Sequence, residues 1–560
     1  MLLIAPLSLP GLTRTTDDTP PPMTSINTAT NLLALTTGDI ASRAANASNT
    51  ANATGTGNVP ATGAVTGTVD STRVTLTQAP PVANWPTYAQ PVANGAVLNW
   101  QQVPSDAISL LMSGNMSTTS LGNRIDQLGS TLLSAIAKGA TSFSQSVFRS
   151  TSAAPATDAD LAVQQSKLQG GADNQFALSI TTASGAQVTV KLGSSDDGLS
   201  VEFEVTKGTL TDAERDQLGK LGDAFQSAVN GLAKQPPVID FSGLTGFDTS
   251  VLRSVDLSAT LGANTGTPQT ITFHADASLR SMHVDGPSGK FDVNVDLKNL
   301  QAIGSPTAQK AALAAWLDRF DTAQSRGNGD ASLMSMFKAA FTGLNSNYPP
   351  AAALPRIPLN NADKSVLSGL ADFNASISQT PKSPNPMRPS EIDSFNYQIS
   401  QSTQIGGTDM LNRTIGQQTQ ATLSASYHRS LWAGVPLNLT SDPKSQNYEY
   451  VKVEDTARSA VDVGYRNGLL AYAQANRSAS QTTQVQRYEM AKLVSDVTTP
   501  VSASSSSDLL TLLQSIMQND AARATKPSAS QTADDDAALD AVRKRTSLEV
   551  DPTRLKAAAK

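Results

Sequence analysis

The fold is decided by residues 176–205, which read FALSITTASGAQVTVKLGSSDDGLSVEFEV. Apolar side chains alternate with polar ones from Phe176 to Ile180 and again from Val188 to Leu192, and a polar turn with a glycine separates the two runs. This alternation predicts a β-hairpin with one buried face, because successive side chains of a strand point to opposite faces of a sheet. The end of the stretch alternates in the same way and predicts a third strand.

The next stretch predicts a helix that covers this sheet. Thr211 and Glu214 have the spacing of a capping box, in which each side chain binds a backbone N–H at the start of a helix. Apolar residues follow at helical spacing from Leu218 to Leu232. Pro236 lies just beyond, and proline cannot continue a helix.

Further alternating runs extend the sheet. They occupy residues 255–261, 271–277 and 291–297, and apolar residues at helical spacing follow around 313–320 and 333–344. We therefore expect an α+β fold with an antiparallel β-sheet of about six strands or more. A capped helix packs on one face, the other face is polar and wet, and a helical pair closes the domain.

Composition suggests how the rest of the chain is divided. Stretches rich in Ser, Thr, Ala and Pro have too few apolar residues to offset the entropy of ordering, so they are expected to be disordered. The expected parts are a mostly disordered N-terminal region (1–104), an amphipathic helical segment (105–149), a central α+β domain (172–345), a proline-rich linker (346–393), a β-rich segment docked on or extending the central sheet (394–500), and a short amphipathic helix with a disordered tail (501–560).

Charge and composition exclude several classes of partner. Charged residues make up 16% of the chain and its net charge is −6, with no basic stripe, so nucleic acid is a poor candidate. The chain has no cysteine, which removes disulfides and thiolate metal sites. No apolar run is long enough to span a bilayer, and the apolar N-terminus lacks the basic residues of a signal peptide. Translation from Met23 is an alternative start. We expect a protein that is cytoplasmic or exported without a standard signal peptide.

The sequence offers few candidate catalytic or metal-binding residues, and none has a convincing pattern. His274, His283 and His428 are the only histidines, and the first two would lie on the wet face of neighbouring strands, where the pattern fits surface residues better than a metal site. Glu202 and Glu204 share one face of a strand and are expected to be solvated. No phosphate loop, dinucleotide fingerprint or nucleophile elbow is present. We therefore predict no catalytic residue, no cofactor and no metal.

The best candidate for an interaction element is a short helix near the C-terminus. Asp508 would cap it, and its apolar residues form a stripe. Those residues are Leu509, Leu510, Leu512, Leu513, Ile516 and Met517. Such a stripe is typical of a helix that docks on a partner.

Several of these patterns together resemble a known group of proteins. The matching stretches are 176–192, 199–232, 247–261, 313–344, Leu423 to His428 and Gln446 to Tyr450. They resemble uncharacterised proteobacterial proteins that carry an α+β domain of unknown function, over roughly residues 172–515. The resemblance implies an architecture and a bacterial origin, and it implies no reaction.

The function that these observations favour is that of a non-enzymatic bacterial scaffold. It would bind one or more proteins whose identity the sequence does not give, in an exported, surface or flagellum-associated setting. One alternative is a carbohydrate- or envelope-binding β module, based on Tyr448, Tyr450, Tyr465 and Tyr472, and it requires those rings to line one exposed groove. A second alternative is a hydrolase that uses the two glutamates or the first two histidines.

Overall fold

The computed structural model describes residues 88–91, 97–150, 157–264, 266–349, 355–525 and 533–558. The chain divides into two units, Met1–Thr77 and Gln78–Lys560, and every described residue belongs to the second. The expectation of disorder for residues 1–104 therefore lies mostly outside the described residues, but within that region Tyr88–Pro91 and Val97–Trp100 form strands of the sheet, with Leu98 and Trp100 buried.

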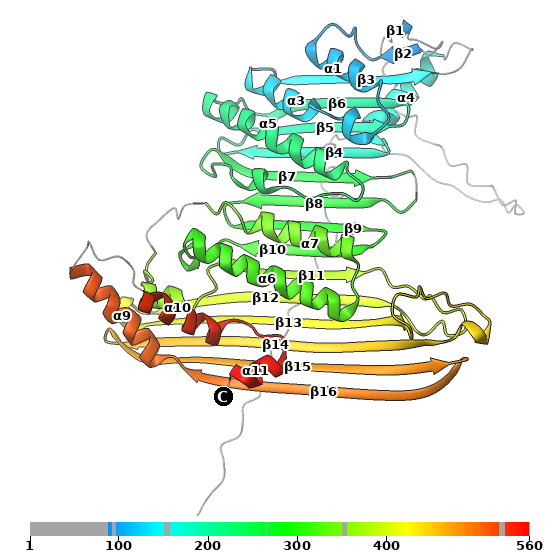
Figure 1. The fold of residues 1–560 in the computed structure, drawn as a ribbon. Helices are drawn as coiled ribbons and strands as arrows, with labels where there is room; N and C mark the ends of the chain where they lie inside the picture. The colour runs from blue at the N-terminus through cyan, green and yellow to red at the C-terminus, as the bar shows by residue number, and fades with distance from the viewer. Residues whose placement is uncertain are drawn as a thin grey trace, which may run out of the picture. The chain divides into compact units, whose positions relative to one another are not determined.

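The described residues form a single antiparallel sheet of 16 strands (Figure 1). This confirms the predicted α+β class and antiparallel sheet, but the sheet is much larger than the expected six or so strands. The strands are β1 (Tyr88–Pro91), β2 (Val97–Trp100), β3 (Ser142–Ser150), β4 (Asn174–Thr182), β5 (Gln187–Ser195), β6 (Gly198–Lys207), β7 (Leu252–Leu261), β8 (Gln269–Asp276), β9 (Leu279–Gly286), β10 (Gly289–Asp296), β11 (Asp372–Gln379), β12 (Ser394–Gly407), β13 (Arg413–Ser430), β14 (Tyr448–Arg466), β15 (Leu469–Glu489) and β16 (Lys492–Asp508).

The strand order follows the chain except near the N-terminal edge. It reads β1-β2-β3-β6-β5-β4-β7, and from β7 to β16 each strand pairs with the next one along the chain. The predicted hairpin is β4–β5, in which Phe176 lies opposite Leu192 and Ile180 lies opposite Val188. Since β7 pairs with the free side of β4, this hairpin joins the N-terminal strands to the long meander.

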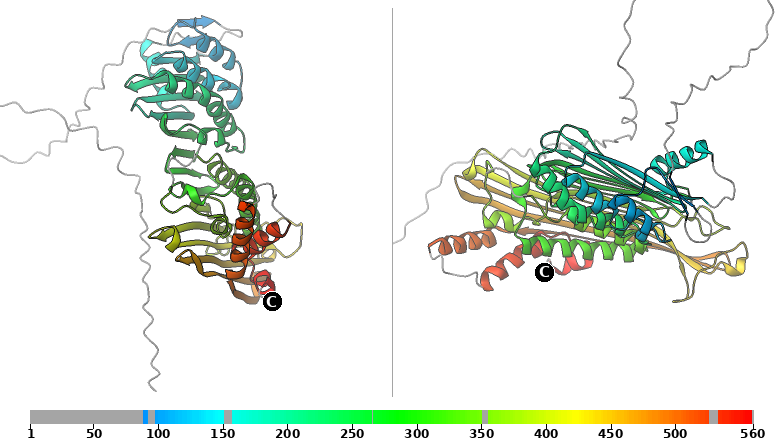
Figure 2. Two further views of the ribbon diagram at one scale, coloured as in Figure 1. Left: turned by 90° about the vertical axis from the view of Figure 1, so that its left-hand side faces the viewer. Right: turned by 90° about the horizontal axis from the view of Figure 1, so that it is seen from above.

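Helices lie mainly on one face of the sheet (Figure 2). They are α1 (Ala107–Asn115), α2 (Leu121–Arg124), α3 (Leu128–Ala137), α4 (Asp158–Gly170), α5 (Asp212–Leu232), α6 (Pro306–Gly327), α7 (Ala331–Leu344), α8 (Asn361–Ser365), α9 (Leu510–Thr525), α10 (Ala533–Thr546) and α11 (Pro552–Ala558). Short 3-10 turns are η2 (Ser242–Thr245), η3 (Leu300–Ala302), η4 (Met410–Asn412) and η5 (Pro443–Ser445). Within the described part of the chain, no helix combines the length and apolarity needed to cross a bilayer.

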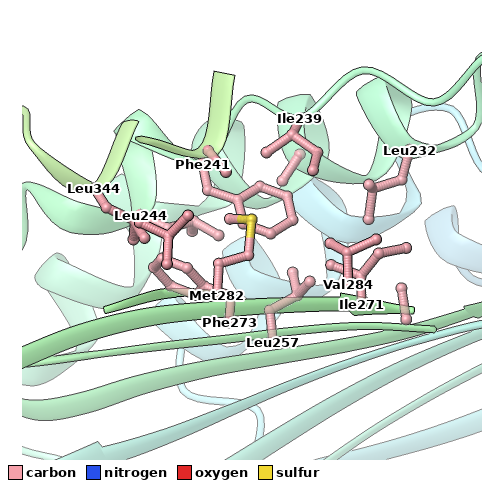
Figure 3. Packing of buried hydrophobic residues seen from close by; sticks show 14 of the residues in the cluster. Leu232, Ile239, Phe241, Leu244, Leu257, Ile271, Phe273, Met282, Val284 and Leu344 are labelled. Atoms are coloured by element: carbon pink, nitrogen blue, oxygen red, sulfur yellow. The ribbon is translucent and has the colours of Figure 1, made fainter. Parts of the chain in front are cut away.

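The core lies between this helical layer and the sheet. Figure 3 shows Phe241, Leu244 and Leu344 from the helical layer above Phe273 and Met282 of the strands. All five side chains are buried. Alternate strand residues point into this layer, and burying them is the main favourable term for the fold.

The predicted capping box at the start of α5 is confirmed. The Thr211 N–H donates to Glu214 at 2.8 Å, and the Glu214 N–H donates to the Thr211 hydroxyl at 3.3 Å. The same carboxylate accepts the Ser184 N–H, at 3.2 Å, from the β4–β5 turn. Burial opposes ionisation of Glu214, but hydrogen bonds from Thr211, Ser184 and Thr182 outweigh it and lower its pKa to about 2.

A buried arginine ties the helical layer to the sheet. Arg280 of β9 is 2% exposed, and its guanidinium donates to the carbonyls of Leu344 at 3.0 Å, Thr245 at 3.1 Å and Asn347 at 2.7 Å. It also donates to the Ser346 carbonyl. These carbonyls end α7, follow it or end η2, at positions where the backbone has no helical partner, so Arg280 supplies the missing donors. Burial lowers its pKa to about 10, which still leaves it charged at neutral pH.

Several segments differ from the sequence-based expectation. Residues 372–379, within the predicted linker, form β11, because their alternating Phe373, Ala375 and Ile377 complete the pairing between β10 and β12. Ser502 to Ser507, whose serine-rich composition suggests a flexible break, lie at the end of β16 and pair with β15. The tail after 525, expected to be disordered, contains α10 and α11.

The predicted β-rich segment extends the central sheet rather than forming a sheet of its own, and β14 and β15 are its longest strands. The helical segment 105–149 also contains most of β3. Within it, α2 and α3 are separate helices, because Gln127 has a left-handed backbone (φ 58°).

The second face of the sheet, which we call the open face, is polar. It carries the alternate residues of the strands, for example Ser258, Thr272, Gln398 and Thr422. Helix α4 covers part of this face near the N-terminal edge, where the Ser200 hydroxyl of β6 donates to the Leu168 carbonyl at 2.7 Å.

Candidate functional site

The predicted interaction helix packs on its own chain. The Leu510 N–H donates to the Asp508 carboxylate at 2.7 Å, so the predicted cap is present at the start of α9. Leu509, Leu513 and Ile516 are buried, and they belong to a cluster with residues of β13, β14 and β15. Leu510, Leu512 and Met517 are partly buried. Much of the stripe therefore contributes to the core, and its role in binding a partner stays a prediction.

The first two histidines lie on the open face beside aspartates. His274 Nδ1 is 2.6 Å from Asp256 and its Nε2 is 3.3 Å from Asp276, whereas His283 Nδ1 is 2.7 Å from Asp292. The hydrogen bond to Asp256 is the main cause that raises the pKa of His274, against the opposing effect of burial. Among the described residues, no group of three or more His, Cys, Asp or Glu side chains is arranged to hold a metal ion.

The carboxylate pair lies on the open face, and the four tyrosines are divided between the two faces. Glu202 makes an ion pair with Lys191 at 3.2 Å across the neighbouring strand. Tyr448, Tyr450 and Tyr465 are buried, and only Tyr472 is well exposed. Tyr465 packs under α9 on the helical side, whereas Tyr448 and Tyr450 lie on the opposite face. The four rings therefore do not line one exposed groove, as the carbohydrate-binding alternative required.

The third histidine belongs to a buried polar cluster on the open side of β13 and β14. His428 Nδ1 is 2.6 Å from Asp393 and its Nε2 is 3.1 Å from Glu391. Tyr448 donates to the same Glu391 carboxylate at 2.6 Å, and Asn385 donates to the Tyr448 hydroxyl at 2.9 Å. Burial, together with the bond to Glu391, raises the pKa of Tyr448 far above its usual value, so the hydroxyl stays a donor. The cluster fastens the loop before β12 to the strands.

An open hollow lies on the helical side, where the cover of helices stops. We call it the α6 groove, and its volume is about 650 Å³. Its residues are Asp321, Thr322, Ser325 and Arg326 of α6, Tyr427 and Arg429 of β13, Val451 and Val453 of β14, and Thr483 and Val485 of β15. The base is apolar, since Val451 and Val453 alternate with polar residues and point to the helical side.

Ion pairs neutralise the rim of the α6 groove. Arg326 binds Asp455 through two nitrogens and also donates to the Thr483 hydroxyl at 3.1 Å. Arg429 donates to Glu449 through Nε at 3.0 Å. With these charges matched, the groove offers an apolar base and a polar rim, which is the usual anatomy of a protein-binding surface.

Sequence patterns predict the strands of this groove but not the groove itself. The alternation from Tyr448 to Val453 correctly indicates a strand, and the apolar spacing around Phe320 correctly indicates a helix. No local pattern indicates the point on the sheet at which α6 ends. That point depends on the pairing of strands more than one hundred residues away in the chain, as the contact of Arg326 with Asp455 illustrates.

Comparison with known proteins shows similarity to a protein family in the N-terminal part of the chain. A family model described as the TamB C-terminal domain matches residues 11–221, a little over a third of the chain. The described part of that stretch contains β1 to β6, α1 to α4 and the first half of α5. No match was found among curated proteins or among solved structures.

The match changes the interpretation of the family resemblance that the sequence patterns suggest. That resemblance points to a domain of unknown function over residues 172–515, whereas the family model has a name and lies nearer the N-terminus. The chain is therefore similar to a described family in its N-terminal part. The α6 groove, formed by residues 321–485, lies outside the matched stretch.

Proposed function

We propose that this protein is a non-enzymatic scaffold of the bacterial envelope that binds other proteins during translocation or assembly. The observation that carries the proposal is the α6 groove, an open hollow of about 650 Å³ with an apolar base and a neutral rim. The similarity to the TamB C-terminal domain supports the envelope setting, because the name denotes a translocation and assembly module.

The occupant that fits the α6 groove best is an amphipathic helix of a partner protein. Elsewhere on this side of the sheet, rows of apolar strand residues are covered by helices of the chain itself, such as α6 and α7. At the groove the row continues without such a helix over it; Val453 is buried there, but Val485 and Tyr427 are only half-buried. A helix with one apolar face would continue the layer and cover the half-buried side chains of Tyr427 and Val485.

The absence of enzymatic activity stays a prediction. It is supported by the side chains around each histidine: His274, His283 and His428 all have an aspartate at their Nδ1 atom, and His428 is almost completely enclosed. None of them lines the α6 groove. An acid–base role needs a residue within reach of a substrate proton, and these positions do not offer one near this hollow.

Photo-crosslinking and a blocking substitution test the proposal. Ser325 lies on the exposed wall of the groove, so Ser325→Trp would fill the hollow without disturbing the core. Ala314→Trp is the matched control, since Ala314 is exposed about three turns earlier on the same side of α6 and does not line the groove. A photo-reactive residue at 325, but not at 314, should capture a specific envelope protein in living cells.

The expected result is that Ser325→Trp removes co-purification of that captured protein and Ala314→Trp leaves it intact. Fractionation of the cells should place the protein with the envelope. Equal co-purification with both variants would contradict the role of the groove, and recovery of the protein only in the cytoplasm would contradict the envelope setting.

A further inference from the structure

The open face near its C-terminal edge contains an isolated positive charge. Arg458 of β14 is exposed, and it lies opposite Gln420 of β13 and Ser478 of β15. In the described structure it makes no ion pair. The nearest charged residues on the same side of β14 are Glu454 and Asp462, each four positions away, which is about 13 Å along a strand.

Two neighbouring hollows lie on this part of the open face, and Arg458 lines one of them. One has a volume of about 380 Å³ and contains Arg458, Asn476 and Ser506, and the other has a volume of about 460 Å³ and contains Thr456 and Ser502. Ser478 and Ser504 line both hollows, so the two hollows form one continuous surface across β14, β15 and β16. We call this the Arg458 surface.

The Arg458 surface offers few kinds of side chain to a ligand. Apart from the methyl group of Ala460, its outward side chains are hydroxyls, an amide and one guanidinium, and Ser504 and Ser506 are exposed. Hydroxyls and amides both donate and accept hydrogen bonds, which suits a ligand that is itself rich in hydroxyls. Neighbouring strands bring rows of these groups about 4.8 Å apart, a spacing comparable to the length of one sugar ring.

An exposed aromatic ring continues the same face. Tyr472 of β15 is 46% exposed and precedes Asn476 by two steps on the same side of the strand. Its ring lies over Gly464, where any Cβ would overlap it, so the absence of a side chain lets the ring lie close to the sheet. An aromatic ring held in this way offers a flat apolar platform, such as the C–H face of a sugar can cover.

We propose that the Arg458 surface binds an acidic polysaccharide in an extended conformation. Arg458 pairs with a carboxylate of the glycan, because a guanidinium can donate two parallel hydrogen bonds to it. The serine, threonine and asparagine side chains bond the sugar hydroxyls, and Tyr472 packs against a sugar ring. This site is distinct from the α6 groove, which lies on the opposite side of the sheet.

Other ligands fit this surface less well. Nucleic acid binding depends on several cations that neutralise successive phosphates, and Arg458 is the one cation of these two hollows whose side chain points to the open face. A lipid would require an apolar surface for its acyl chains, whereas serine dominates here. A carboxylate-bearing chain of hydroxylated rings uses both the isolated charge and its polar surroundings.

Binding of full-length protein to a polyuronate tests the proposal. Isothermal titration with oligogalacturonate should show binding, and a neutral glucan of equal length should bind at least tenfold more weakly. Arg458→Gln should weaken oligogalacturonate binding at least tenfold. Lys290→Gln is the matched control, because it removes one exposed cation from the same face, four strands away, and should leave binding unchanged.

Two more variants and a second anion show whether binding is specific to the Arg458 surface. Ser504→Leu, which fills the shared hollow from an exposed position, should weaken binding, while Ser325→Trp in the α6 groove should not. Melting temperatures of all variants should match that of the parent protein, which shows that folding is unchanged. The proposal is overturned if oligogalacturonate does not bind, if Arg458→Gln and Lys290→Gln behave alike, or if oligoglutamate binds as tightly with the same dependence on Arg458.

Discussion

Replacing Arg280 by methionine should weaken the attachment of the helical layer to the sheet. The guanidinium is buried and donates to the carbonyls of Leu344, Thr245, Asn347 and Ser346. Methionine fills a similar volume but has no donor. The substitution therefore leaves these carbonyls without a partner in a place that water reaches poorly.

The size of the effect follows from the balance of two opposing terms. Each hydrogen bond to a charged group contributes about 1.5–3 kcal/mol, so four of them amount to roughly 6–12 kcal/mol. Removing the buried charge also removes its desolvation penalty, which is several kcal/mol. The net loss should be about 3–5 kcal/mol, near the upper end for a single substitution.

Hydrogen exchange is the appropriate assay, because a chain of this length need not unfold in one step. The amides around η2 and the end of α7 should exchange faster by a factor that corresponds to the expected loss. Arg253→Met is the control, since Arg253 is exposed on β7. A loss below about 1 kcal/mol, or equal effects of both substitutions, would contradict this prediction, because it would mean that the carbonyls find other donors.

Three further predictions concern pH and backbone conformation. Glu214→Gln should lower the free energy of unfolding by about 2–3 kcal/mol above pH 4.5. The difference from the parent protein should vanish as the pH falls towards 2, because the pKa of the Glu214 carboxyl is lower in the folded state than in the unfolded state. Acid unfolding curves of both proteins measure this difference. His274→Asn should lower the melting temperature below pH 6.5, because the hydrogen bond to Asp256 favours the charged imidazole and raises the pKa of His274 in the folded state. The difference in melting temperature should disappear as the pH rises through that raised pKa. Ala491→Gly should raise stability by up to about 1 kcal/mol in thermal unfolding, because Ala491 has φ 66° in the β15–β16 turn; an unchanged or lower melting temperature would contradict this.

The parts of the fold that are predictable from sequence are those whose signals are local. The hairpin from Phe176 to Leu192 and the Thr211 cap depend on neighbouring residues, and both are present in the structure. The full extent of the sheet does not follow from local patterns, because adding strands depends on distant pairing. Phe373 shows the difficulty, since its spacing from Leu370 also fits a helix, and only the neighbouring strands make it part of β11.

The sites are harder to predict than the strands. The serine-rich run from Ser502 to Ser507 suggests a flexible segment, although pairing with β15 makes it a strand. This pairing brings Ser504 to the same hollow as Arg458, one strand further along the sheet. The cluster around His428 has no sequence signal either, because Glu391 and Tyr448 are far from it along the chain. Nothing in a sequence pattern indicates that these three side chains meet.

The strand order has a mechanical consequence. Because β1 and β16 form opposite edges of one sheet, a force that pulls these two strands apart acts across the strands, perpendicular to their length. Such a force is carried by every strand pair in series, so the sheet would open first at its weakest pair and then separate in steps instead of breaking everywhere at once. The helices that bridge several strands would then determine where separation pauses, and the region fastened by Arg280 is the natural place for such a pause.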